Sequence, residues 1–333
     1  MNNAKGFILI LFHILQIISI SKGQLKVGFY SQTCPNAESI VKSVVKEATL
    51  VNPQMPPVLL RLHFHDCFVE GCDGSILITE NVSNPEIGAN AHQGVEGFEQ
   101  INDAKKELET QCPGVVSCAD IVAMAARDAI FLAGGPSYNV ETGRRDGKIS
   151  NIKLAADMPD VDDQIDTLKS KFRNKGLSEK DLVLLSGGAH TIGTAACFFM
   201  SKRLYNFTGK DNFNDSDPKI NPNFLPVIKN QCPKDGDFDV RIPLDAVTSD
   251  KFDDQSLRNI KNGTAVLSSD ARLYDDEFTR QVVNSYADVD QNLGLKKVSS
   301  FAQDFAKAMV KMGRIGVKVG SDGEIRRVCN SFN

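Results

Sequence analysis

The sequence predicts a mainly α-helical protein with a small amount of β-structure, and three observations support this fold class. Apolar residues recur at every third or fourth position in several segments, which places them on one face of a helix. An alanine-rich run ends at Gly134-Gly-Pro136, a strong helix stop. One short segment near the end of the chain, residues 317–327, has the pattern of two strands joined by a turn.

The same patterns locate the individual elements. We predict helices over residues 37–50, 98–109, 119–133 and 296–312, and a further helix that begins soon after Gly187-Gly188 and carries His190 to Leu204. Residues 206–223 are rich in Asn, Asp and Pro and predict a solvated loop. Residues 317–319 and 324–327, separated by Ser-Asp-Gly, predict a small hairpin. No segment has the composition of a linker between independent domains.

The first 23 residues are predicted to be a signal peptide. Lys5 precedes an apolar run from Phe7 to Ile18, and small and polar residues follow up to Gly23. This run is too short for a permanent membrane anchor, and no later stretch is apolar enough to cross a bilayer. We therefore expect cleavage near Gly23–Gln24, a mature domain over residues 24–333, and no membrane association after cleavage.

Cysteines and glycosylation sequons agree with a secretory route. Eight cysteines follow the signal segment: Cys34, Cys67, Cys72, Cys112, Cys118, Cys197, Cys232 and Cys329. An even number of cysteines in an oxidising compartment predicts four disulfides, although the count alone does not give their pairing. Asn-x-Ser/Thr sequons begin at four positions: Asn81, Asn206, Asn214 and Asn262.

The charge balance excludes one large class of partners. The chain has 38 basic and 42 acidic residues, and loss of Lys5 and Lys22 with the signal leaves 36 basic residues and a net charge of −6. No basic stretch with interleaved aromatic residues is present. Nucleic acid is therefore not an expected partner.

Residues 59–68, Leu-Leu-Arg-Leu-His-Phe-His-Asp-Cys-Phe, carry the main chemical signal. Their alternation of apolar and polar residues is typical of a strand, which would put Arg61, His63 and His65 on one face. A helix would instead bring Arg61, Phe64 and His65 together and turn His63 away. The local pattern leaves both alternatives open.

Two signatures resemble those of the secreted plant (class III) haem peroxidases. The first combines Leu-Arg-Leu-His-Phe-His-Asp-Cys-Phe-Val at residues 60–69 with Gly-Cys-Asp-Gly-Ser at 71–75, and the second is Leu-Leu-Ser-Gly-Gly-Ala-His-Thr-Ile-Gly at 184–193. The resemblance continues through residues 112–120, 133–136 and 143–146, and it keeps all eight cysteines in register. It implies that residues 57–69 form a helix, and that distal and proximal helical halves enclose haem b (iron protoporphyrin IX).

The resemblance assigns roles to the distal residues, and their chemistry suits those roles. A neutral imidazole at His65 would move a proton from the inner to the outer oxygen of hydrogen peroxide, because its unperturbed pKa is about 6.5. The guanidinium of Arg61 would stabilise the charge that grows on the departing oxygen. Phe64 would form an apolar wall, and His63 is expected to be a core or supporting residue.

On the proximal side, the resemblance implies that His190 binds the haem iron and that Asp270 accepts the other N–H of its ring. The Gly-Gly pair before His190 would let the backbone turn tightly. The chain has no tryptophan, and Leu244 stands where some intracellular relatives use one to store an oxidising equivalent. The second equivalent is therefore expected on the porphyrin, with a tyrosine as the alternative site.

One feature departs from the family pattern. The family's distal asparagine, which contacts the distal histidine, lies in a stretch where this sequence is shifted by a gap, residues 86–94. We expect Asn90 to fill that role, with His92 and Gln93 as alternatives.

The resemblance further implies two calcium sites, a disulfide pairing and a place for reductants. The distal calcium ligands would be Asp66, Val69, Gly71, Asp73 and Ser75. The proximal ones would be Thr191, Asp245, Thr248, Lys251 and Asp253, with backbone carbonyls at Val69, Gly71 and Lys251. The pairs would be Cys34–Cys112, Cys67–Cys72, Cys118–Cys329 and Cys197–Cys232. Reductants would meet an exposed haem edge near Pro159 and Phe199.

The implied function is a peroxidase that reduces hydrogen peroxide to water and oxidises small phenolic donors in one-electron steps, through a ferryl haem and a porphyrin radical. We expect the protein to be a monomer. We expect it at the cell exterior or wall, since only four residues follow Cys329 and leave no room for a vacuolar tail.

Three other hypotheses are weaker. A non-catalytic adhesive glycoprotein would not need Arg61, His65, His190 and Asp270 intact. A zinc hydrolase built on the face with His63 and His65 lacks a convincing third ligand. The signal and the cysteines argue against an intracellular ascorbate-type peroxidase.

Overall fold

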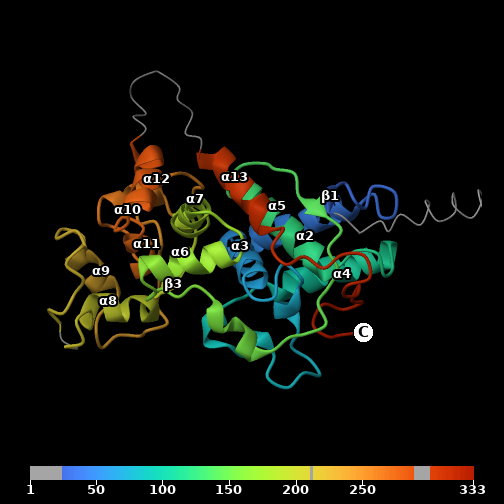
Figure 1. Ribbon diagram of the computed structural model, residues 1–333, viewed down its shortest axis with the longest axis horizontal. Helices are drawn as coiled ribbons and strands as arrows, with labels where there is room; N and C mark the ends of the chain where they lie inside the picture. Colours follow the sequence, from blue (N-terminus) through green and yellow to red (C-terminus); the bar gives the residue numbers. More distant parts are fainter. Residues whose placement is uncertain (1–24, 211–212, 289–300) are drawn as a thin grey trace, which may run out of the picture.

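The computed structural model describes residues 25–210, 213–288 and 301–333. Helices dominate it, and two small antiparallel sheets complete the fold (Figure 1). The predicted class, mainly α with a little β, is confirmed. The predicted signal peptide and residues 296–300 of the last predicted helix lie outside the described residues. Within the described ranges, no helix is both long and apolar enough to span a membrane.

The helices predicted over residues 37–50, 98–109 and 119–133 are found with small shifts at their ends, and residues 301–312 of the last predicted helix are helical. The longer helices of the first half are α2 (Ala37–Val51), α3 (Met55–Cys67), α4 (Phe98–Gln111) and α5 (Cys118–Leu132). The α-helices of the second half, several of them short, are α6 (Ile165–Asn174), α7 (Glu179–Val183), α8 (Ser201–Tyr205), α9 (Leu225–Gln231), α10 (Gln255–Lys261), α11 (Ser268–Arg272), α12 (Glu277–Ala287) and α13 (Phe301–Met312). Short 3₁₀ turns occupy Ser75–Leu77, Glu86–Gly88, Asn90–His92, Ile152–Asp157, Ala189–Thr191 and Cys197–Met200.

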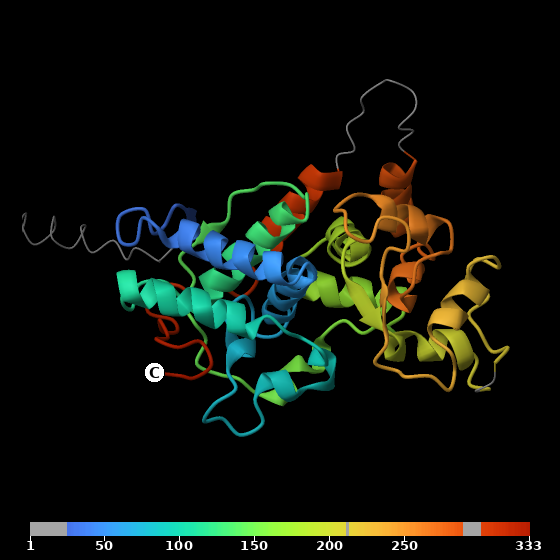
Figure 2. The ribbon, with the colours of Figure 1, turned by 180° about the vertical axis from the view of Figure 1, so that it is seen from behind.

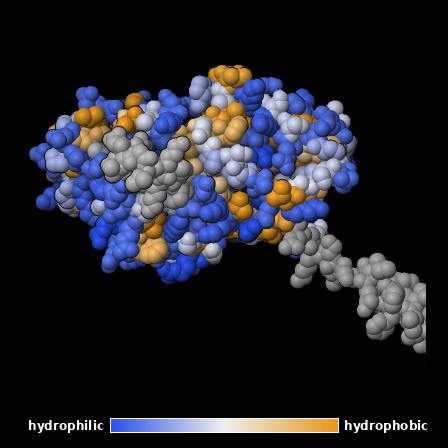
Figure 3. All heavy atoms as spheres, turned by 90° about the horizontal axis from the view of Figure 1, so that it is seen from above, coloured by the Kyte–Doolittle hydropathy of each residue, from blue (hydrophilic) through white to orange (hydrophobic). Residues whose placement is uncertain are grey.

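The two halves lie on either side of α3. Figures 1 and 2 agree in placing α2, α4 and α5 toward one end of the molecule and α8 to α12 toward the other. Leu59 and Leu62 of α3 belong to the apolar core of the first half, whereas Leu60 and Phe68 join that of the second. Most large apolar side chains lie in these cores, and hydrophobic residues are scattered among hydrophilic ones on the face in Figure 3. Helix α3, which carries Arg61 and His65, thus packs against the cores of both halves.

Helix α5 explains how α3 is held so closely. Ser117 caps its N-terminus by accepting a hydrogen bond from the backbone N–H of Asp120. Its many small alanine side chains are buried, which lets the backbone of α3 approach. The buried Asp120 then pairs with Arg144 at 2.8 Å and fixes the following segment on the same core.

The predicted helix from Gly187-Gly188 to Leu204 is wrong. The helical segment precedes His190: α7 continues into a π-helical turn at Leu184–Gly188 and a 3₁₀ turn at Ala189–Thr191. Gly193 then takes a φ of +95°, which few other residues adopt, and the chain leaves the helix there. Thr194–Ala196 forms strand β3, which pairs with β4 (Arg241–Pro243).

The predicted hairpin near the end of the chain is also wrong. Its two segments do not pair with each other, because residues 145 and 146 lie between them and form the bridges Arg145–Lys318 and Asp146–Glu324. The buried carboxylate of Asp146 accepts the backbone N–H of Ala119 at 2.9 Å and of Arg326 at 2.8 Å. The other small sheet pairs β1 (Lys26–Val27) with β2 (Glu141–Thr142).

All four disulfides follow the pairing that the resemblance implied: Cys34–Cys112, Cys67–Cys72, Cys118–Cys329 and Cys197–Cys232. Cys67–Cys72 closes the turn that follows α3, and Cys118–Cys329 ties the end of the chain to the start of α5. Cross-links over long sequence separations restrict the unfolded chain most strongly.

Candidate active site

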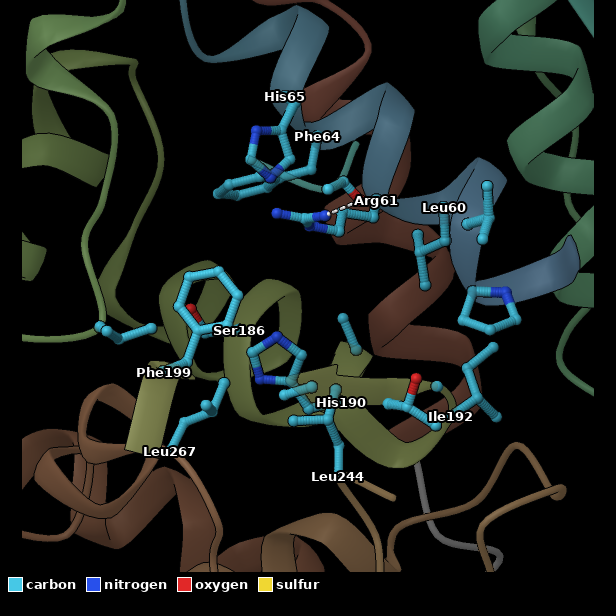
Figure 4. Close-up of a pocket in the computed structure, with 18 of the residues that line it drawn as sticks. Leu60, Arg61, Phe64, His65, Ser186, His190, Ile192, Phe199, Leu244 and Leu267 are labelled. Atoms are coloured by element: carbon cyan, nitrogen blue, oxygen red, sulfur yellow. Dashed lines mark hydrogen bonds between the residues drawn. The ribbon is translucent and has the colours of Figure 1, made fainter. Parts of the chain in front are cut away.

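A cavity of about 440 Å³ lies between α3 and the turns that carry His190. Its size falls within the range of about 300–1,000 Å³ that is usual for ligand and cofactor pockets. Apolar side chains line most of it, among them Phe64, Ile192, Leu244 and Leu267, whereas a few polar groups point into it (Figure 4).

The helical alternative for residues 59–68 is the one that the structure adopts. Arg61, Phe64 and His65 project from α3 toward the cavity (Figure 4). His63 turns away and contacts the sulfur of Cys67, with Nδ1 at 3.6 Å from Sγ. Burial and then Arg144 lower the pKa of His63 to about 3, so it is a neutral core residue at physiological pH.

This geometry removes the basis for a zinc site on α3. Among the described residues, His63, Cys67 and Cys72 are close enough together to hold a metal ion. Both cysteines are consumed by their disulfide, so neither offers a thiolate ligand. His63 and His65 point in different directions from the helix and cannot ligate one ion.

Arg61 is fixed above the cavity by two backbone carbonyls. Its Nη1 donates to the oxygen of Gly94 at 2.6 Å, and its Nη2 donates to that of Gln93 at 2.9 Å. Burial and the nearby Arg241 lower its pKa to about 10, which leaves it charged at neutral pH. Arg241 lines the mouth of the same cavity and is held by Thr194, whose hydroxyl and carbonyl oxygens accept its hydrogen bonds.

His65 is buried and contacts a second imidazole, and this corrects the expectation for Asn90. Its Nδ1 lies 2.9 Å from Nδ1 of His92, so in the described part of the chain His92, and not Asn90, fills the place beside His65. Asn90 is exposed and only lines the cavity. Burial, Arg61 and His92 hold the pKa of His65 well below its usual value, and burial and Arg61 lower that of His92 to about 4.

Glu86 stands behind His92. Its Oε1 lies 3.5 Å from Nε2 of His92, and its Oε2 accepts the hydroxyl of Ser75 at 2.9 Å. Burial raises the pKa of Glu86 to about 8. The sequence analysis missed this carboxylate. The 3₁₀ turn at Glu86–Gly88, which aims it inward, leaves no periodic signal in the sequence.

His190 faces the cavity from the opposite side (Figure 4). Its Nδ1 lies 2.8 Å from Oδ2 of the buried Asp270, which leaves Nε2 free to act as a ligand. Burial alone would lower the pKa of His190, but the Asp270 carboxylate raises it above its usual value. A ring oriented by a carboxylate is the usual arrangement of a metal-binding histidine.

The predicted reductant contacts lie at the same cavity. Pro159 and Phe199 both line it and are partly exposed, so they stand where the cavity meets the surface. Leu244, expected where some relatives carry tryptophan, also lines the cavity.

The predicted distal calcium ligands gather behind α3. Asp66, Asp73 and Ser75 are buried together with Glu86. Burial, Asp73 and Glu86 raise the pKa of Asp66 well above its usual value. Oδ1 of Asp66 is buried without a hydrogen-bond partner among the described residues, as expected of an oxygen whose partner would be a cation. Val69 and Gly71, the carbonyl candidates, lie in the segment that the Cys67–Cys72 disulfide closes.

The predicted proximal ligands also form one cluster. The hydroxyl of Thr191 lies 3.3 Å from the carbonyl oxygen of Lys251 and 3.4 Å from Asp253. The hydroxyl of Thr248 lies 3.1 Å from both Asp245 and Asp253. Hard oxygen donors from two segments therefore converge directly after His190, which fits a calcium ion.

Comparisons with known proteins agree with this geometry. Residues 41–289 match the family described as peroxidase. Peroxidase 43 of Arabidopsis thaliana is 60% identical over 317 residues, which cover 94% of each chain. Peroxidase 13 of the same plant is 54% identical over 325 residues and 98% of each chain. Peroxidase N1 of Nicotiana tabacum is 44% identical over 332 residues, 100% of this chain and 98% of its own. The chain therefore belongs to the class III haem peroxidases, enzymes that reduce hydrogen peroxide.

Proposed function

We propose that this peroxidase is secreted, binds haem b through His190 and two calcium ions, and oxidises small phenolic donors in one-electron steps. One observation carries this proposal: His65 with Arg61 and His190 with Asp270 face each other across a single apolar cavity. The domain would comprise residues 24–333 and act as a monomer.

The residues present fit the haem and divide the work between them. When bound, the haem iron supplies the redox chemistry that cleaves the peroxide bond. Nε2 of His190 would hold the iron, and Asp270 would keep that ring oriented and electron-rich. His65, kept neutral by its surroundings, would accept the proton of one peroxide oxygen and return it to the other. Arg61, fixed by two carbonyls, would stabilise the negative charge on the departing oxygen.

Pro159 and Phe199 support a phenolic donor. A flat aromatic donor needs only contact with the cofactor edge for electron transfer, and an apolar rim with an aromatic ring favours such contact. Both residues border the cavity and remain partly exposed. These two residues give no basis for choosing one phenol over another.

The two oxygen clusters support the calcium ions. The unpartnered Asp66 oxygen and the mutual repulsion of Asp66, Asp73 and Glu86 would both be relieved by a divalent cation. The second cluster includes Thr191, the residue that follows His190, so an ion there would brace the proximal turn.

Secretion is supported by chain features that suit an oxidising route. All eight cysteines are paired, and disulfides persist in secreted proteins. Of the four sequon asparagines, Asn81, Asn214 and Asn262 are exposed and Asn206 is half-buried. The apolar run of the predicted signal would direct the chain to this route.

An absorption spectrum and a turnover assay on the purified protein test the proposal. We expect a Soret band, turnover of guaiacol with hydrogen peroxide, and two calcium ions per chain by elemental analysis. A protein that folds without haem would contradict the cofactor assignment. Haem uptake without guaiacol turnover would instead favour the non-catalytic glycoprotein.

A further inference from the structure

We infer that Arg241 binds the carboxylate of an acidic phenolic donor at the mouth of the cavity, so that the enzyme favours such donors over neutral ones with the same ring. The inference rests on the proposed oxidation of phenolic donors and names their class. Pro159 and Phe199 offer apolar contact and do not distinguish donors by charge, whereas a cation on the same rim does.

The first step is the way in which Arg241 is held. Its side chain is exposed and lines the same cavity as Pro159 and Phe199. Its Nε donates to the hydroxyl of Thr194 at 2.9 Å, and its Nη2 donates to the carbonyl oxygen of Thr194 at 3.0 Å. These bonds use the edge of the guanidinium that Nε and Nη2 form. The edge formed by Nη1 and Nη2 is left for a ligand, and its parallel N–H groups match the two oxygens of a carboxylate.

The charge of Arg241 is not neutralised by a neighbouring acid. Glu96 and Asp160 also line the cavity and are exposed, but among the described residues neither they nor any other carboxylate forms an ion pair with Arg241. Its partner Thr194 is neutral. The mature chain as a whole is acidic, so a preference for anionic donors would have to come from a local cation of this kind.

A second cation nearby strengthens the case for an anion. A Cβ at Gly94 would lie 3.8 Å from Nη1 of Arg61 and 4.0 Å from Nη1 of Arg241, so the two guanidinium groups flank one glycine. After burial, Arg241 is the main cause of the lowered pKa of Arg61, because the two like charges repel. Both groups are held by neutral oxygens. A carboxylate at Arg241 would relieve this repulsion.

The two cations have different places in the reaction. Arg61 and Arg241 are the lysine or arginine side chains that line the cavity within the described ranges. Arg61 lies on α3 beside His65 and serves the peroxide in the proposed function. Arg241 lies on β4, paired with Ala196 of β3, and the turn that carries Phe199 follows β3 directly. The cation and the aromatic contact therefore belong to one small unit, on which a donor's ring and its acid group would both be bound.

The haem brings carboxylates of its own, and a haem propionate would suit the same edge of Arg241. The chemistry is shared, so the experiment needs a donor arm and a cofactor arm. Arg241→Gln removes the charge, and Arg241→Lys keeps a charge without the forked donors. The matched control is Arg327→Gln, which changes the net charge equally at an exposed arginine that does not line the cavity.

The donor arm compares ferulate with methyl ferulate on the haem-loaded protein. The two donors share a ring and differ in the charged carboxylate. Dissociation constants come from the change of the Soret band without peroxide, and kcat/KM comes from turnover. We expect the preference for ferulate over its ester to fall about 3–10-fold in Arg241→Gln, a modest factor because the site is open to water. We expect Arg241→Lys to restore part of it and Arg327→Gln to keep the wild-type ratio.

The wild type alone provides a second measurement that does not depend on the folding of a variant. The affinity for ferulate should fall as salt rises from about 10 mM to about 0.5 M, whereas the affinity for methyl ferulate should not, because salt screens only the charged contact. Equal affinities of the wild type for both donors at low salt would overturn the inference.

The cofactor arm compares haem with its dimethyl ester, by transfer from the protein to apomyoglobin. Faster loss of haem but not of the ester in Arg241→Gln, with an unchanged donor ratio, would show that the carboxylate at Arg241 is the haem's and would overturn the assignment to the donor. A folded Arg241→Gln variant that binds ferulate and methyl ferulate equally more weakly would also overturn it, since packing alone would explain that result. A wild type without a Soret band or guaiacol turnover would instead contradict the proposed function.

Discussion

The two histidines that face each other across the cavity differ in the group that contacts their Nδ1 atom. Asp270 contacts His190 at 2.8 Å, whereas the neutral ring of His92 contacts His65 at 2.9 Å. The pKa of His190 is raised by its carboxylate even though burial opposes this, and the pKa of His65 is lowered by burial, Arg61 and His92. An anionic partner raises the basicity of a metal-binding imidazole, whereas an uncharged partner does nothing to raise the pKa of a buried base, which therefore stays unprotonated at neutral pH.

The two rings are also positioned by different kinds of backbone. His65 lies within the regular helix α3, where spacing alone brings it onto the same face as Arg61. His190 lies where α7 ends in π and 3₁₀ turns. A Cβ at Gly187 would lie 2.5 Å from Ile260 Cδ1, and one at Gly188 2.9 Å from Phe301 Cε2. Both glycines have ordinary helical backbone, at Gly188 a φ of −68°, so they are needed for space and not, as expected, for a tight turn.

The largest predicted effects come from removing each of the two rings in turn. His65→Leu removes the base but not the proposed iron ligand, so we expect the reaction with peroxide to slow by about 10²–10⁴-fold with the Soret band retained. His190→Ala should instead lose or loosen the haem. Stopped-flow mixing and absorption spectra measure both. Haem loss in His65→Leu together with tight haem in His190→Ala would reverse the assignment of the two sides.

The part of the fold that could be predicted from the sequence is the part whose elements have a clear local pattern of apolar residues. Helices that lie in one core, such as α2, α4 and α5, carry their own periodicity and were found within a few residues. Residues 59–68 do not show a helical period because α3 is buried on several sides, with polar residues such as His63 and His65 buried as well as apolar ones. Its helical form followed only from the resemblance.

The failures concern contacts between distant parts of the chain. Strand β3 exists because Arg241, 47 residues away, brings β4 to Thr194. The segments around Lys318 and Glu324 are separated by residues 145 and 146, which no local pattern reveals. Asn90 was favoured by residue type, whereas the 3₁₀ turn Asn90–His92 directs His92 inward and leaves Asn90 exposed.

A smaller effect is expected from the partner of the proximal ring. Asp270→Asn keeps a hydrogen-bond acceptor but removes the charge that raises the pKa of His190. We expect haem affinity or peroxide reactivity to fall about 10–100-fold, measured by haem transfer to apomyoglobin and by stopped flow. Unchanged haem affinity and peroxide reactivity would show that the charge of the partner of His190 does not matter for function.

The smallest effect concerns the third buried histidine of the distal half, His63, which serves neither face of the cavity. Its pKa is about 3 in the folded protein and about 6.5 in an unfolded chain. Between these values the unfolded state binds the proton and the folded state does not, so acidification favours unfolding by up to about 1.4 kcal/mol per pH unit. Above pH 6.5 the contribution is constant.

We expect His63→Gln to make the free energy of unfolding, measured in urea from pH 7 to 4.5, fall less steeply than in the wild type. Slopes must be compared because the substitution also changes packing against Cys67. Equal slopes would mean that His63 takes up its proton over the same pH range in the folded protein as in the unfolded chain, and the lowered pKa derived for this side of α3 would be wrong.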